Sequence, residues 1–203
     1  MNTLDAFYPI ADSAAMVSTL VQAGAHLVQL RIKGEQSPYV RAQTEQAALI
    51  CRHRNVQLVV NDHWQIAIDS GIDFVHLGQG DLQGADLPAL RRHGVRLGIS
   101  THDREELDRA LSIQPTYVAL GPIWPTSLKV MPWAPQGIHR LTEWKRLIGS
   151  LPLVAIGGIT VDRARSCLGA GADSVAVVSD VVRHPDPAAR VKLWQEALQQ
   201  ELA

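Results

Sequence analysis

A short run of alternating polar and apolar residues has the composition of a phosphate-binding segment. It reads Gln29-Leu30-Arg31-Ile32-Lys33, so an amide and two cations alternate with aliphatic residues. If the run is extended, its three polar side chains project to one side. A guanidinium offers a planar fork that matches phosphate oxygens, and an ammonium offers a point charge. The run therefore predicts an anion site, although an ordinary strand end with solvated cations has the same pattern.

Two aspartates, Asp62 and Asp81, each follow closely on a separate apolar run, and Asn61 directly precedes the first of them. Mg²⁺ is commonly bound through one or two carboxylates, while water and substrate phosphates complete its shell. The pair therefore predicts a magnesium site beside the cationic run. The alternative is that both aspartates cap helices, which Asp does well at such junctions.

Glycines late in the chain predict a second anion site of a different kind. Gly157-Gly158 closes one apolar run, and Val178-Ser179 closes the next. Adjacent glycines allow backbone N–H groups to approach an anion closely. This second site is expected to be built largely from the backbone, whereas the first is cationic.

Residues 122–137 form the longest stretch without a periodic pattern, and their four prolines exclude a regular helix. Within the stretch, Thr126-Ser127-Leu128-Lys129 supplies hydroxyls and a cation. A long loop in so economical a chain is usually functional. We therefore expect a lid over the active site, with a packed surface loop as the alternative.

Eight short apolar runs, rich in Val, Ile and Leu, provide the strands that position these residues. The runs are nearly continuous rather than alternating, which indicates strands buried on both faces. They are Phe7–Ala11, Leu27–Ile32, Gln57–Val60, Phe74–Gly78, Arg96–Ile99, Tyr117–Gly121, Leu153–Ile156 and Ser174–Val178. Amphipathic segments of helical length lie between most of them, including 13–23, 37–52, 103–111, 138–148 and 161–170.

This rhythm predicts the α/β class and a single (β/α)₈ TIM barrel over residues 1–203. A doubly wound open sheet is the alternative, but no Gly-x-Gly-x-x-Gly follows the first run. Functional groups of such barrels lie at the carboxyl ends of the strands. The polar candidates fall there, as does Ser100, which could donate to a substrate or cap the following helix.

The composition excludes several classes of protein. The 203 residues include 19 Lys+Arg and 20 Asp+Glu, a formal net charge of −1 that argues against a nucleic-acid partner. No run approaches 18 apolar residues, so we expect no membrane span. Two cysteines, without a basic and apolar leader, predict reduced thiols in a cytoplasmic protein.

Taken in order, the motifs resemble those of the thiamine-phosphate synthase family across nearly the whole chain. The matching segments are Tyr8-Pro9-Ile10-Ala11-Asp12, Gln29-Leu30-Arg31-Ile32-Lys33, Asn61-Asp62, His76-Leu77-Gly78-Gln79-Gly80-Asp81-Leu82, Gly98-Ile99-Ser100-Thr101-His102, Gly121-Pro122-Ile123-Trp124-Pro125-Thr126, Ala155-Ile156-Gly157-Gly158-Ile159 and Ala176-Val177-Val178-Ser179. Single motifs of this kind are common among barrels, whereas the ordered set is specific.

The resemblance implies a transferase that joins 4-amino-2-methyl-5-(diphosphooxymethyl)pyrimidine to 4-methyl-5-(2-phosphooxyethyl)thiazole and releases pyrophosphate. In the family mechanism pyrophosphate leaves first, and the thiazole nitrogen traps a pyrimidine carbocation. Such a reaction needs stabilisation of the leaving group rather than a nucleophilic side chain. The resemblance further implies Mg²⁺ as the cofactor and two phosphorylated small molecules as substrates, and a homo-oligomer stays open.

Carried over by position, the resemblance also assigns roles to residues. The pyrimidine pyrophosphate would be held by Gln29, Leu30, Arg31, Ile32, Lys33, Asn61, Ser100 and Lys129. The thiazole phosphate would be held by Thr126, Ser127, Leu128, Gly158, Val178 and Ser179. Asp62 and Asp81 would ligate Mg²⁺, and Lys129 and Ser100 would be the catalytic residues.

One position departs from the family pattern Thr-x-Thr-Lys, because Leu128 stands where the second threonine is usual. The missing hydroxyl is expected to cost about 1 kcal/mol of thiazole-phosphate binding unless Ser127 replaces it. Two other functions stay open. A thiazole tautomerase on the same barrel would need the phosphate site and a proton shuttle but no metal, and a non-catalytic protein would only bind thiamine phosphates.

Overall fold

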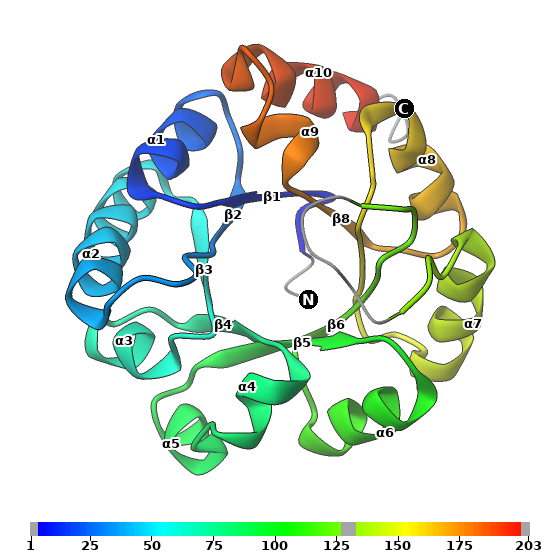
Figure 1. Ribbon diagram of the computed structural model, residues 1–203, viewed down its shortest axis with the longest axis horizontal. Coiled ribbons are helices and arrows are strands. Elements are labelled where there is room, and N and C mark those ends of the chain that lie inside the picture. The colour runs from blue at the N-terminus through cyan, green and yellow to red at the C-terminus, as the bar shows by residue number, and fades with distance from the viewer. Residues whose placement is uncertain (1–3, 127–132, 200–203) are drawn as a thin grey trace.

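The computed structural model describes residues 4–126 and 133–199, and within them eight parallel strands close into one barrel (Figure 1). The strands are β1 (Phe7–Ala11), β2 (Leu27–Leu30), β3 (Gln57–Asn61), β4 (Phe74–Leu77), β5 (Arg96–Thr101), β6 (Tyr117–Leu120), β7 (Leu153–Ile156) and β8 (Ser174–Val177). The barrel closes where β8 pairs with β1, with Tyr8 opposite Ala176. The predicted (β/α)₈ barrel is confirmed, and the open sheet is wrong.

Helices surround the barrel on its outside (Figure 1). They are α1 (Ala14–Gln22), α2 (Ser37–Arg54), α3 (Trp64–Asp69), α4 (Gln79–Gln83), α5 (Leu87–Arg92), α6 (Arg104–Ile113), α7 (Ile138–Ile148), α8 (Val161–Gly169), α9 (Ser179–Val182) and α10 (Pro187–Gln199). In the described part of the chain, none of these helices is long and apolar enough to cross a membrane.

Strand ends differ from the expected ones where a neighbouring strand stops. β2 ends at Leu30, two residues before the predicted end, since β1 already ends at Ala11. The backbone N–H of Arg31 donates to the carbonyl of Ala11 at 2.8 Å, and the chain then leaves the sheet. β3 and β5 run further than predicted, to Asn61 and Thr101.

Two separate hydrophobic cores follow from the alternation of side chains along each strand. The larger core fills the space between the barrel and the helices, and the smaller one fills the barrel interior. The interior core consists of Tyr8, Ile10, Leu27, Val59, Phe74, Tyr117, Ala119, Val154 and Ala176. On β2, Leu27 faces inward while Val28 and Leu30 face the helices, so Gln29 also turns toward the interior.

We expect neither cysteine to react with a thiol reagent in the folded protein. Burial raises the pKa of Cys51 on α2 to about 11 and that of Cys167 on α8 to about 12. At pH 8 roughly 0.1% or less of each thiol is therefore in the reactive thiolate form. Ellman's reagent should release no chromophore from native protein and two equivalents from urea-unfolded protein. Rapid release under native conditions would contradict this burial.

Candidate active site

A cavity of about 510 Å³ lies at the carboxyl ends of the strands. Eight of the predicted site residues line it: Gln29, Arg31, Asn61, Ser100, Thr126, Gly158, Val178 and Ser179. Three others, Ser127, Leu128 and Lys129, lie outside the described residues. The barrel thus brings the predicted cationic segment and the predicted glycine site to one cavity.

A cation and two carboxylates meet beside the end of β3. Lys33 Nζ forms an ion pair with Asp62 Oδ2, and Asn61 Nδ2 donates to the same oxygen at 2.6 Å. Asp62 has a φ of 63°, a left-handed conformation that ends the strand sharply. Burial raises the pKa of Asp81, and the charge of Asp62 and a hydrogen bond with it raise that pKa further. The two carboxylates therefore lie close enough to repel each other.

Neither aspartate caps the helix that follows it. His63 occupies the N-cap of α3 and Gly78 that of α4, while Asp81 stands in the first turn of α4. The capping alternative is therefore wrong for both, and their carboxylates remain available for a cation.

Leu30 and Ile32 point away from the cavity. Both are buried in the core between the barrel and the helices. They alternate with Gln29 and Arg31, whose side chains line the cavity. Only the backbone groups of Leu30 and Ile32 are therefore left to contact a ligand.

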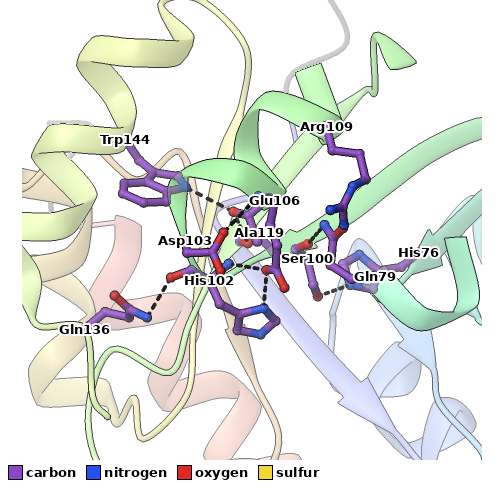
Figure 2. Close-up of polar contacts among 11 residues, drawn as sticks. His76, Gln79, Ser100, His102, Asp103, Glu106, Arg109, Ala119, Gln136 and Trp144 are labelled. Atoms are coloured by element: carbon purple, nitrogen blue, oxygen red, sulfur yellow. Dashed lines mark hydrogen bonds and ion pairs between the residues drawn. The ribbon is translucent and has the colours of Figure 1, made fainter. Parts of the chain in front are cut away.

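The floor of the cavity carries a buried hydrogen-bond network that sequence reasoning missed. Gln29 Nε2 donates to Tyr8 OH at 2.9 Å, and Tyr8 OH lies 3.1 Å from Tyr117 OH. Tyr117 OH lies 2.7 Å from His76 Nδ1. The other ring nitrogen, His76 Nε2, lies 2.9 Å from Ser100 Oγ (Figure 2). The available signal was a set of polar side chains at inward positions of apolar strands, since such groups need partners when buried.

The floor is polar but uncharged near pH 7. Burial lowers the pKa of His76 from 6.5 to about 4, although the Asp62 carboxylate acts in the opposite direction. Burial also raises the pKa of Tyr8 and of Tyr117 well above the usual value for a phenol. The imidazole and both phenols are therefore neutral in the folded protein.

Ser100 is held from two sides at the end of β5 (Figure 2). Gln79 Nε2 donates to the Ser100 carbonyl at 2.8 Å, and Arg109 Nη1 fixes the Gln79 amide by donating to its oxygen at 2.8 Å. The N-cap of α6 is Asp103, whose side chain accepts from the Glu106 N–H at 2.9 Å. Ser100 therefore does not cap this helix, and its hydroxyl faces the cavity.

The opposite side of the cavity is built from the turn after β7. Gly157 and Gly158 have φ values of 97° and 66°. Their carbonyls are engaged by other groups: the Trp124 N–H donates to Gly157 O at 3.0 Å, and Arg163 Nη1 donates to Gly158 O at 2.6 Å. Successive N–H groups of such a turn form an anion-binding concavity. Residues 178–179 follow β8, which pairs with β7, and so adjoin this turn.

Arg163 is a cavity residue that sequence reasoning did not single out. It lies in the first turn of α8, and its guanidinium carbon stands 5.1 Å from the centre of the Trp124 ring. The arginine therefore adds a positive charge to a side of the cavity that was expected to be built mainly from backbone. Its place in the first turn of the predicted helix over 161–170, which follows the Gly157-Gly158 turn, was the sequence signal for it.

The described residues after the long loop return to the end of β5. The Trp133 ring stacks on His102 with 3.9 Å between ring centres. Gln136 Nε2 donates to the His102 carbonyl at 2.9 Å, and Glu106 accepts from the His102 N–H at 2.7 Å (Figure 2). The returning segment is thus attached close to the strand end that carries Ser100.

Comparison with known proteins places this geometry in a family context. The profile of a family described as thiamine monophosphate synthase matches residues 5–181. A thiamine-phosphate synthase of Rhizobium etli is 56% identical over 194 residues, covering 96% of this chain and 95% of the relative. One from Neisseria meningitidis serogroup A is 44% identical over 189 residues, covering 93% and 92%. The structure of a thiamine phosphate pyrophosphorylase from Pyrococcus furiosus superposes with a TM-score of 0.84 at 24% identity, covering 97% and 96%, and shows the same fold.

Proposed function

Because the chain belongs to the thiamine-phosphate synthase family, we propose that it condenses 4-amino-2-methyl-5-(diphosphooxymethyl)pyrimidine with 4-methyl-5-(2-phosphooxyethyl)thiazole. The products are thiamine phosphate and pyrophosphate. The enzyme class, a transferase of the pyrimidinylmethyl group, comes with the family. The identity of the two substrates and the part played by Mg²⁺ are proposals for this chain.

The single observation that carries the proposal is that one cavity is lined by two separate groups of residues suited to binding anions. Arg31 and Asn61 line one part of it beside the Lys33 ion pair, and Gly158 and Arg163 line another. One phosphorylated substrate would need only one such site. A diphosphate and a monophosphate held at opposite sides would bring their rings together over the neutral floor, which is the requirement for joining them.

The donor set beside β3 fits Mg²⁺. Asp62 and Asp81 are two oxygen-donating carboxylates. Burial raises the pKa of Asp81 and the charge of Asp62 raises it further, and a bound divalent cation would relieve this repulsion. Among the described residues no group of three or more His, Cys, Asp or Glu side chains is placed to hold a metal. Two carboxylates suit a cation that takes its remaining ligands from water and pyrophosphate. When bound, Mg²⁺ would supply charge neutralisation on the pyrophosphate.

The protein's own residues would bind and orient the reactants. Arg31 and Lys33 would hold the pyrophosphate as negative charge develops on it, and Asn61 would donate to it through its amide. Ser100 would contact the pyrimidine from the floor. Lys129, which lies outside the described residues, is proposed to act on the same pyrophosphate.

The tautomerase alternative is less well supported, because it needs a group that takes up and returns a proton near pH 7. Among residues 4–126 and 133–199, His76 is the histidine that lines the cavity. Burial lowers the pKa of His76 to about 4, and both of its ring nitrogens already have partners. Such a histidine is better suited to positioning than to proton transfer.

The deciding experiment combines purified protein, both substrates and Mg²⁺, followed by oxidation of the product to fluorescent thiochrome. We expect signal that requires all three additions. Release of pyrophosphate in step with thiochrome would establish the stoichiometry. Fluorescence no higher than in a protein-free control would refute the synthase assignment.

The same assay tests the phosphate site through Gly158→Ala. A Cβ there would stand 2.5 Å from Pro125 O and 2.8 Å from Trp124 Cβ, at a positive φ that alanine rarely adopts. We expect the KM for the thiazole phosphate to rise about 10-fold or more, with a smaller change for the pyrimidine substrate. Gly169→Ala is the matched control, since open space surrounds that helical position. Equal effects on both KM values would argue against a separate thiazole-phosphate site.

A further inference from the structure

The buried network in the barrel floor has a direction, which can be followed from one donor whose role is unambiguous. An amide nitrogen can only donate, so the Gln29 Nε2 contact of 2.9 Å makes the Tyr8 oxygen an acceptor. The Tyr8 hydroxyl still has one proton to give. Its other contact among the described residues is the Tyr117 oxygen at 3.1 Å, so that proton goes to Tyr117.

The same reasoning continues to the cavity. Tyr117 accepts from Tyr8 and must donate its own proton to His76 Nδ1, 2.7 Å away. Because Nδ1 accepts this hydrogen bond, it carries no proton, and the proton between the ring and Ser100 is on Nε2. That N–H donates to Ser100 Oγ at 2.9 Å. The Ser100 hydroxyl thus accepts one hydrogen bond from His76, and its own proton is left to donate to a group in the cavity.

We propose that the buried chain from Gln29 through Tyr8, Tyr117 and His76 holds Ser100 as a hydrogen-bond donor toward the substrate. The inference rests on the proposed function, and it specifies the chemistry that the floor recognises. A donor at Ser100 selects an aromatic ring that presents an unprotonated nitrogen there. The exocyclic amine of an aminopyrimidine, which can only donate in this plane, is excluded from this contact.

Burial makes this direction difficult to reverse. Tyr8, Tyr117 and Gln29 are at most 3% exposed, so reversing one of these contacts would leave a polar atom unpaired and without access to water. The Ser100 backbone is meanwhile held by Gln79, which donates to its carbonyl and so keeps the residue beside His76. His76 and the two tyrosines are therefore positioning residues, because they act on the substrate through Ser100.

The first test reads the proton directly. In protein labelled with ¹⁵N-histidine, long-range ¹H–¹⁵N correlation distinguishes the two neutral tautomers, and His76→Gln identifies the His76 signals among those of the eight histidines. We expect a proton on Nε2 and a hydrogen-bonded, unprotonated Nδ1. Tyr117→Phe should shift Nδ1 toward the value of a nitrogen without a hydrogen bond, whereas Tyr39→Phe, at an exposed tyrosine of α2, should not. A proton on Nδ1 in the wild-type protein would overturn the proposal.

The second test measures which substrate atom Ser100 contacts. The affinity of the wild type and of Ser100→Ala is measured for the pyrimidine pyrophosphate and for two kinds of analogue. One kind replaces a ring nitrogen with CH, and the other lacks the exocyclic amine. We expect Ser100→Ala to bind the pyrimidine pyrophosphate about 10-fold more weakly than the wild type does. One ring-CH analogue should bind the wild type about 10-fold more weakly than the parent compound, and Ser100→Ala should not weaken the binding of that analogue further. The donor role would be overturned if the effect of Ser100→Ala disappeared for the analogue without the amine instead, or persisted for every analogue.

A positioning role also predicts rescue by a conservative change. His76→Gln can still present an N–H to Ser100, whereas His76→Leu cannot. We expect the leucine variant to raise the KM for the pyrimidine about 10-fold, and the glutamine variant to recover most of that loss. Equal KM values in the two variants would contradict the role. If no pyrimidine binds at all, the proposed function fails, while the tautomer measurement still decides the direction of the network.

Discussion

Replacement of Gly98 by alanine is expected to lower the free energy of unfolding by about 3 kcal/mol and to remove most of the activity. A Cβ at this position of β5 would overlap the ring of Tyr117, which is completely buried. Tyr117 cannot move aside, because it packs edge-on against Phe74 at 5.7 Å and stacks on His76 at 5.6 Å between ring centres. Overpacking of a core costs about 1–3 kcal/mol, and the upper value applies where the neighbours are fixed.

Urea unfolding followed by tryptophan fluorescence measures this loss as a lower midpoint, and the thiochrome assay measures the activity. Gly169→Ala is the control, since no atom outside its own helix lies near that position. This control should leave the free energy of unfolding unchanged or raise it by up to about 1 kcal/mol, because alanine favours helices. A wild-type midpoint for Gly98→Ala would mean that the barrel interior has space for a methyl group.

The regular parts of the fold could be predicted because each depends on a local pattern. Eight buried strands appear as continuous apolar runs, and every predicted run contains the observed strand or overlaps it. The ends of β2 and β5 were less accurate, each by two residues, since a strand ends where its partner does. The helices α4 and α9, of five and four residues, are too short for a helical period to be recognised.

The candidate site could be predicted in part. The alternation of polar and apolar residues correctly indicated that Gln29 and Arg31 face one way, and both line the cavity. The hydrogen bond between Tyr8 and Tyr117 was not predictable, because it joins residues 109 positions apart through the closure of the barrel. Arg163 was missed for a similar reason, since its contact with Gly158 depends on how α8 follows its turn.

Substitution of Asp81 by asparagine is expected to move activity and stability in opposite directions. Burial and the nearby Asp62 raise the pKa of Asp81 above 3.8, so its charged form is less favourable in the folded chain than in the unfolded chain. That difference destabilises the wild-type protein at neutral pH and disappears as the pH falls below the raised pKa. An amide removes the repulsion, so the metal-free variant should have the higher urea midpoint at pH 7 and lose this advantage in acid.

Turnover should fall in the same variant on the order of 100-fold, the usual effect of losing one group that stabilises developing charge. Asp108→Asn is the matched control, because it makes the same change in net charge at an exposed ion pair with Arg104. MgCl₂ with inorganic pyrophosphate should raise the unfolding temperature of the wild type and of the control but not that of Asp81→Asn. Full activity of Asp81→Asn across a low-magnesium titration, or a stabilisation by magnesium equal to that of the control, would contradict the ligand role, because the remaining carboxylate of Asp62 would then suffice to hold the cation.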